Sequence, residues 1–180
     1  HGGGNDLKFP HHENEIAQNI GACGSTPANY WLHTNMLLLN GKKMSKSDGN
    51  NITPVELLTG NSPHVTKGYS PMTVRFSTLQ SHYASQLDLT DEALAAAEKG
   101  FRRLMEGNKA LQGFIGSPEA TRPLDAEIDT LIAGAFEEMS DDFNAPKAMA
   151  KLFELVSIIN KLNDKHLALE DVSNSCIERL

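Results

Sequence analysis

The sequence lacks any apolar run of about 18 residues or more, so it predicts no membrane-spanning helix. It also lacks a basic-then-apolar start, and we therefore predict no signal peptide. Only two cysteines occur, Cys23 and Cys176, far apart and without a CxxC partner. This pattern argues against a disulfide framework or a self-contained cysteine zinc site, and it favours a reducing, cytoplasmic setting.

An excess of positive charge is also missing, since the net charge is −7 at pH 7. Proteins that bind nucleic acid through general phosphate attraction are usually basic. Residues 1–50 are balanced in charge, so the whole deficit lies in residues 51–180. Any contact between that part and nucleic acid is therefore expected at local basic spots such as Arg102 and Arg103.

The 180 residues, 39% of them hydrophobic, are enough for one sizeable core or two small ones. The first residue is His1 rather than methionine, and it stands inside a motif-like run. We therefore expect the chain to be a piece of a longer protein. Residues 1–68 are rich in glycine, histidine and turn signals, whereas residues 69–180 read as helical.

The first part predicts a helix from Pro10 to Cys23, because proline is favoured at the first helical position and glycine follows the end. Residues 32–39 are apolar and typical of a strand, with Asn40-Gly41 as the turn. Thr53, Pro54 and Glu56 form a capping box that opens a short helix.

From about Ser70 onward the pattern predicts helices alone. Their apolar stripes and caps place them at roughly 70–83, from 90 to a break at 116, 124–139, from 144 to beyond 162, and 169–180. Amphipathic helices with short links favour an antiparallel bundle.

Two runs carry the chemistry. The first begins with three glycines, Gly2–Gly4, whose amides can approach a ligand closely. His11 and Glu15 follow, four residues apart and hence on one helical face, which resembles a small-molecule site with half a metal site beside it. On spacing alone such a pair is more often a surface hydrogen bond. His12, about 100° further round the helix, is expected to face another way.

The second run is GKKMSKSDGN, residues 41–50, with three lysines and two serines between two glycines. Lysine ammonium groups suit phosphate oxygens, and flanking glycines allow a loop to close over a ligand. The run therefore predicts a polyphosphate site. A solvated basic turn is an equally weighted alternative from physics alone.

The run KMSKS, residues 43–47, is identical to the signature of class I aminoacyl-tRNA synthetases. The runs HGGGNDL (1–7), FPHHENEIAQ (9–18) and YWLH (30–33) resemble those of cysteinyl-tRNA synthetases, and DDFNAPKA (141–148) resembles that family's helical domain. This resemblance covers nearly the whole chain.

The resemblance implies the α/β tail of a Rossmann-like catalytic domain over residues 1–68, carrying the KMSKS loop. An all-α antiparallel helical bundle that binds tRNA would follow over 69–180, making the chain mostly helical overall. The implied enzyme is a cytoplasmic, monomeric ligase that uses ATP with Mg²⁺ to activate L-cysteine as cysteinyl-adenylate and transfers it to tRNA(Cys). The family's HIGH motif is not in this sequence, so the chain alone is expected to be inactive.

The resemblance also implies roles for individual residues. His11 and Glu15 would be ligands of one zinc ion, with two further ligands upstream of this chain. Zinc would take the soft thiolate and reject a serine hydroxyl. Lys43 and Lys46 would be catalytic and would hold the nucleotide together with Ser45 and Ser47. The substrate pocket would comprise His1, Gly2, Gly3, Asp6, Trp31 and His33.

Two other functions fit parts of the sequence. A cysteine ligase with an amino-sugar acceptor, as in the mycothiol pathway, shares the adenylate chemistry and differs in the acceptor. A non-catalytic helical module that binds tRNA or a partner helix belongs to another class. The long helical part favours tRNA as the acceptor.

Overall fold

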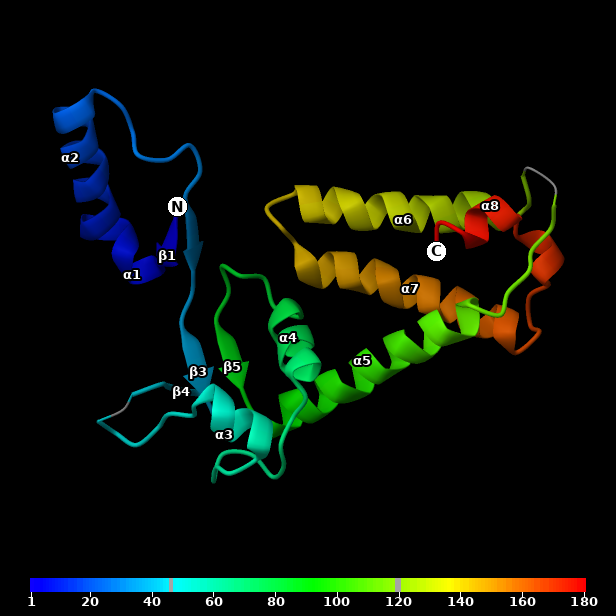
Figure 1. The fold of residues 1–180 in the computed structure, drawn as a ribbon, viewed down its shortest axis with the longest axis horizontal. Coiled ribbons are helices and arrows are strands. Elements are labelled where there is room, and N and C mark those ends of the chain that lie inside the picture. The colour runs from blue at the N-terminus through cyan, green and yellow to red at the C-terminus, as the bar shows by residue number, and fades with distance from the viewer. Residues whose placement is uncertain (46, 119–120) are drawn as a thin grey trace. The chain divides into compact units, whose positions relative to one another are not determined.

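The structure is a computed structural model that describes residues 1–45, 47–118 and 121–180 (Figure 1). The chain forms two compact units. The first comprises residues 1–70 and 81–93, and the second comprises residues 71–80 and 94–180. This division differs from the predicted boundary after residue 68 because residues 81–93 return to the first unit.

The first unit combines short strands with helices. In chain order its elements are β1 (Gly2–Gly4), α1 (Asn5–Leu7), the kinked π-type segment η1 (Lys8–His12), α2 (Glu13–Cys23), β2 (Leu32–Thr34), β3 (Leu37–Leu39), β4 (Lys42–Lys43), α3 (Pro54–Thr59) and β5 (Leu87–Leu89). The fold class is the predicted one, an α/β part followed by helices.

Strands β1 and β2 pair in parallel with Gly3 opposite His33, and the helical segments connect them. Helix α2 begins at Glu13 rather than at the predicted Pro10, because the residues just before it wind as the π-type segment η1, inside which only Phe9 is extended (φ −141°, ψ 133°). The predicted end is confirmed, since Gly24 closes α2 in the left-handed conformation that favours glycine.

The predicted strand over residues 32–39 is two strands that belong to different sheets. The second of them, β3, pairs antiparallel with β4 and parallel with β5. The turn at Asn40 and Gly41 is confirmed, with φ values of 53° and 75°. Strand β5 corrects the prediction that all of the chain after Ser70 is helical. The strand has only three residues, Leu87–Leu89, and so short a run cannot be recognised as a strand between the predicted helices.

Helix α3 confirms the predicted capping box. Thr53 accepts a hydrogen bond from the Glu56 backbone N–H, and the Glu56 carboxylate accepts one from the Thr53 backbone. Pro54 occupies the start of the helix. The hydrogen bonds that the Glu56 carboxylate accepts from the Thr53 backbone N–H and from the Thr53 hydroxyl lower its pKa.

The second unit is helical. Its elements are α4 (Pro71–Leu79), α5 (Asp91–Leu111, from residue 94 on), α6 (Asp125–Ser140), α7 (Ala145–Asn163), the 3₁₀ turn η2 (Leu169–Asp171) and α8 (Asn174–Ile177). Helices α6 and α7 lie side by side and antiparallel, joined by a short loop (Figure 1). As predicted, Asn144 caps α7 by accepting a hydrogen bond from the Lys147 N–H.

The core of the second unit lies between α6, α7 and the C-terminal turns. Its most buried members are Ile128, Leu155, Ile158, Leu162, Val172 and Cys176. The ring of Phe76 in α4 contacts those of Phe101 in α5 and Phe153 in α7, which joins these three helices. Gly107 lets α5 approach α7, because a Cβ there would lie 3.1 Å from Val156.

The predicted fifth helix over residues 169–180 is wrong in extent. The chain forms η2 and the four-residue α8 instead, separated by the extended residues Val172 and Ser173. The Ser173 N–H donates to the buried carboxylate of Asp125 at 2.9 Å, and this contact holds the segment against the start of α6. Among the described residues, no helix is both long and apolar enough to cross a membrane.

Candidate functional site

Three potential metal ligands meet beside the triple-glycine strand. His1 precedes β1, His12 ends the kinked segment, and Glu15 lies in the first turn of α2. One ligand atom from each lies within 4.8 Å of the others. The Oε2 atom of Glu15 lies 3.3 Å from Nε2 of His1 and 3.9 Å from Nε2 of His12.

His12 is the buried member of this group, with 3% of its surface exposed. Its Nδ1 lies 2.8 Å from Nε2 of His33 on β2. The Trp31 ring packs against it with centroids 5.0 Å apart, and the His1 ring meets it edge-on at 4.9 Å. Gly3 leaves room for the ring, because a Cβ at that position would lie 2.8 Å from Cε1 of His12.

The prediction that His12 faces away from Glu15 is wrong. Both imidazoles precede α2 in the π-type segment η1, whose winding differs from that of a regular α-helix from Pro10. In the observed first turn, His12 stands three residues before Glu15, and that spacing also places two side chains on one face. His11 is exposed, and its ring lies 5.6 Å from that of His12. Its role as a ligand stays a prediction.

The residues predicted for the substrate pocket gather around this cluster. His1 and Trp31 pack together at 4.8 Å between ring centroids, and Gly3 and His33 lie opposite each other on β1 and β2. Gly2 lies in β1 next to Gly3, and the carboxylate of Asp6 fills the space beside Gly4. His12 is not among the predicted site residues, although its i, i+3 spacing to Glu15 is a signal that the sequence carries.

The donor set fits a zinc ion. Imidazole nitrogen and carboxylate oxygen are both common zinc ligands. The Oε2 atom of Glu15 is enclosed, and no hydrogen bond from a described residue reaches it. Nε2 of His1 lies 3.3 Å away without hydrogen-bond geometry, so this buried oxygen lacks a hydrogen bond, and a cation would relieve the cost of burying it.

The second site is the basic loop. Lys42 and Lys43 line a pocket of about 290 Å³ whose other walls are Asp48, Gly49, Asn50 and His64. The side-chain amide of Asn50 donates to the carbonyls of Lys42 and Lys43 at 3.3 and 3.2 Å. The amide therefore ties the end of the loop to the strand that carries both lysines.

The predicted loop residues are partly described. The hydroxyls of Ser45 and Ser47 lie 2.8 Å apart, and Lys43 lines the pocket. Lys46 lies outside the described residues. Asn50 and His64 are not among the predicted site residues. Asn50 supports the pocket only through hydrogen bonds of its side-chain amide, and His64 comes from a loop that is distant in sequence.

Comparisons with known proteins bear on both sites. Residues 1–99 match the family model described as the catalytic domain of class I (C) tRNA synthetases. This match covers more than half of the chain, including both the histidine cluster and the basic loop. The chain belongs to the family of class I (C) tRNA synthetases. Residues 136–179 match the DALR domain model.

Several curated relatives are cysteine–tRNA ligases. The one from Cytophaga hutchinsonii is 52% identical over 163 residues, which cover 89% of this chain and 33% of the relative. The one from Porphyromonas gingivalis is 41% identical over 180 residues, which cover 100% of this chain and 35% of the relative. The chain thus spans about a third of the length of these relatives.

A solved structure shares the fold of this synthetase-family chain. It is the LeuRS of Agrobacterium radiobacter K84 in a ternary complex with tRNA and LeuAMS. The TM-score is 0.67 at 17% sequence identity, covering 99% of this chain and 24% of that chain. At this identity the likeness concerns the fold alone.

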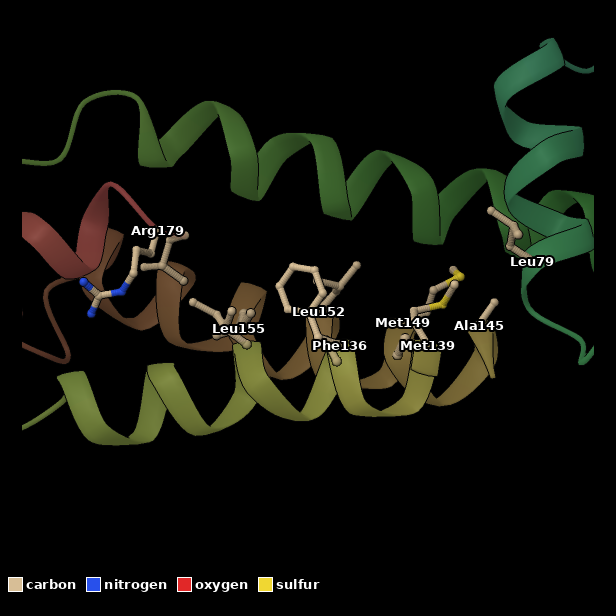
Figure 2. A pocket seen from close by; sticks show the side chains of 12 residues that line it. Leu79, Phe136, Met139, Ala145, Met149, Leu152, Leu155 and Arg179 are labelled. Atoms are coloured by element: carbon tan, nitrogen blue, oxygen red, sulfur yellow. The ribbon is translucent and has the colours of Figure 1, made fainter. Parts of the chain in front are cut away.

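The second unit carries an apolar groove of about 390 Å³ between α6 and α7 (Figure 2). Figure 2 shows the side chains that line it, including those of Phe136, Met139, Ala145, Met149, Leu152 and Leu155. Phe136 is 72% exposed. Most of the lining falls in the stretch that matches the DALR domain, and Arg179 is its charged member. Among the described residues that line the groove, none is a nucleophile or a general base.

Proposed function

We propose that this chain is part of a cysteine–tRNA ligase. The ligase would activate cysteine with ATP and then transfer the cysteinyl group to tRNA(Cys). Support comes from the family match over residues 1–99 and from the enclosed Glu15 oxygen among imidazoles beside a glycine strand. The enclosed Glu15 oxygen is the observation on which the proposed chemistry rests, because it offers a cation site in the same unit as the lysine-lined pocket.

The first step forms one bond and breaks another. A carboxylate oxygen of cysteine attacks the α-phosphorus of ATP, and pyrophosphate leaves. Lys43, with Lys46, would stabilise the negative charge that develops on the phosphate oxygens. Ser45, Ser47 and the loop amides would orient the nucleotide. In the second step a terminal ribose hydroxyl of tRNA attacks the acyl carbon, AMP leaves, and the hydroxyl proton passes to solvent.

Selection of cysteine would rest on a zinc ion held by Glu15 and by His11, the imidazole that the family resemblance implies, with two ligands from outside this chain. His12, the imidazole of this pair that lies in the cluster with Glu15, would then act beside the ion and not as its ligand. When bound, such an ion supplies a soft Lewis acid for the thiolate sulfur, which serine lacks. The carboxylate of Glu15 would hold the cation, and the rings of Trp31 and His1 would exclude water from it. His33 and Asp6 would line the pocket for the rest of the amino acid.

The test uses an intact ligase, in which this chain replaces the matching third of one of its relatives. We expect cysteine-dependent ATP–pyrophosphate exchange from this protein and charging of tRNA(Cys) rather than of an amino sugar. Lys46→Ala should abolish exchange, and Glu15→Ala should raise the KM for cysteine before that for ATP. Exchange that does not depend on cysteine, or an unchanged rate in Lys46→Ala, would refute the proposal. The 180-residue chain alone is expected to give no exchange.

Cobalt substitution tests the metal directly. A cobalt-loaded intact ligase should show visible absorption bands that change when cysteine is added but not when serine is added. Glu15→Ala and His11→Ala should each weaken cobalt binding. Retention of cobalt by His11→Ala would remove that residue from the ligand set.

A further inference from the structure

The two ring nitrogens of His12 have different neighbours. Nδ1 lies 2.8 Å from Nε2 of His33, within hydrogen-bond distance, so one nitrogen donates and the other accepts. Nε2 lies 3.9 Å from Oε2 of Glu15, beyond hydrogen-bond distance. Of these two contacts of the His12 ring, only the one with His33 is a hydrogen bond, and only it fixes how the two side chains are oriented.

The surroundings of His12 leave its ring little freedom. The Trp31 and His1 rings pack on it, and the His11 ring lies 5.6 Å away. On the strand side, the ring occupies the space where a side chain at Gly3 would stand. A ring that is 3% exposed and enclosed in this way can hold a neighbour in one orientation.

We propose that His12 is a positioning residue, whose Nδ1 atom holds the His33 side chain in the orientation that the cysteine pocket requires. This inference rests on the proposed function, because the pocket that His33 lines is that of the ligase. His33 is only half-buried and stands on a three-residue strand, so its backbone alone leaves the ring free to rotate. His12 supplies the missing constraint from a different element.

Two amide substitutions separate the nitrogens of His12. The side-chain amide of asparagine reaches the position of Nδ1, and by turning it presents either a donor or an acceptor to His33. The longer amide of glutamine reaches the position of Nε2, near Glu15, and leaves His33 without a partner. His12→Asn therefore keeps the proposed contact, and His12→Gln removes it.

The experiment measures pyrophosphate exchange by the intact ligase at varied cysteine and varied ATP. We expect His12→Gln to lower kcat/KM for cysteine by about 10- to 100-fold, the usual loss when an outer partner of a site residue is removed. The KM for ATP should not change, and His12→Asn should stay within a few-fold of wild type. Gln18→Ala, an exposed change on α2, is the matched control.

A spectroscopic readout reports the contact without activity. The ¹⁵N chemical shifts of the His33 ring, recorded after histidine labelling, should move in His12→Gln and stay near the wild-type values in His12→Asn. A double-mutant cycle adds a second route. If His12 acts through His33, His12→Gln should cost nothing further in a His33→Ala background.

Three results would overturn the proposal. Equal losses in both amide variants would mean that ring packing matters and the Nδ1 contact does not. Loss in His12→Asn with retention in His12→Gln would assign the role to Nε2 and Glu15. Additive losses in the double mutant would show that His12 does not act through His33. Failure of the proposed function is distinguishable, because the wild-type protein would then lack cysteine-dependent exchange while the ¹⁵N shifts still judge the contact.

Discussion

The ring of His12 fills the space that a side chain at Gly3 would need. An ideal Cβ at Gly3 would stand 2.8 Å from Cε1 of His12 and 2.9 Å from Cδ1 of Leu7. Carbon atoms do not approach so closely without a shift of one of them. Glycine at this position therefore allows β1 to pass directly over a buried imidazole and to keep its parallel pairing with β2.

Gly3→Ala should displace the His12 ring and, with it, the orientation of His33. We expect a rise of about tenfold or more in the KM for cysteine of the intact ligase, because small displacements of site residues are costly. The KM for ATP should stay the same, since the lysine-lined pocket is formed by other elements. The measurement is pyrophosphate exchange at varied concentrations of each substrate.

Gly21→Ala is the control for this change. Gly21 lies in α2, and a Cβ there would meet nothing within 4 Å. The substitution should leave both KM values unchanged and stabilise the helix by about 0.5–1 kcal/mol. An equal rise in the KM for cysteine in both variants would contradict the steric explanation.

The two chemical runs could be found from the sequence, but the partners inside the cluster could not. Glycine spacing and the KMSKS run located both sites. Which imidazole lies near Glu15 depends on how the chain winds through the π-type segment before α2, and no periodicity reveals that winding. The structure places His12 in the cluster with Glu15, and the role of His11 as a ligand stays a prediction.

The fold shows the same division between local and distant effects. The capping box at Thr53, the cap at Asn144 and the turn at Asn40 were predicted because each depends on a few neighbouring side chains. Strand β5 was missed, because its three residues become a strand only by pairing with β3 about 50 positions earlier. The helix predicted over residues 169–180 is longer than the observed α8. The Ser173 N–H donates to Asp125, and this hydrogen bond replaces one that a continuous helix would need.

The two cysteines should differ in reactivity. Burial is the main cause that raises the pKa of the Cys176 thiol to about 11, with the charge of Asp125 adding to it. At pH 8 only about one thousandth of this thiol is then thiolate, the reactive form. Cys23 is exposed. We expect one fast-reacting thiol per folded chain with a disulfide reagent, and two in denaturant.

Cys23→Ser should remove the fast phase and leave the slow one. Cys176→Ser should leave the fast phase as it is. Rapid reaction of the folded Cys23→Ser chain would show that the segment around α8 opens readily.

The Asp125 carboxylate should make the second unit sensitive to acid. Burial, the largest single influence, raises its pKa, but hydrogen bonds from Ser173, Arg122 and Cys176 together lower it below the usual value. A carboxylate with a lowered pKa stabilises the fold above about pH 4, and this contribution is lost as the pH falls through its folded-state value. Asp125→Asn should cost about 1–3 kcal/mol at pH 7, because an amide cannot accept both backbone hydrogen bonds.

The difference between wild type and Asp125→Asn should shrink as the pH falls below about 4, where the carboxyl of the unfolded chain takes up a proton, and on through the lower pKa of the folded state. Urea unfolding followed by helical circular dichroism at pH 7, 5 and 3 measures this change. Glu127→Gln, an exposed change in the same first turn of α6, is the control. A difference that does not depend on pH would assign the loss to packing instead of charge.

Asn50 should matter to the nucleotide and not to cysteine. Its amide holds the carbonyls of Lys42 and Lys43, and its backbone carbonyl accepts from the Ser45 N–H at 2.9 Å. Asn50→Ala keeps the backbone bond and removes the side-chain bonds, so the strand that carries Lys43 loses one of its supports. Each lost hydrogen bond is worth about 0.5–1.5 kcal/mol, which corresponds to a rise of up to about tenfold in the KM for ATP.

Asn50→Asp should behave like Asn50→Ala, since a carboxylate of the same shape cannot donate to the two carbonyls. Asn61→Ala, an exposed change in the following loop, should leave the KM for ATP unchanged. If the KM for cysteine rose as much as that for ATP, the loop would serve both substrates, and the assignment of this pocket to the nucleotide would be wrong.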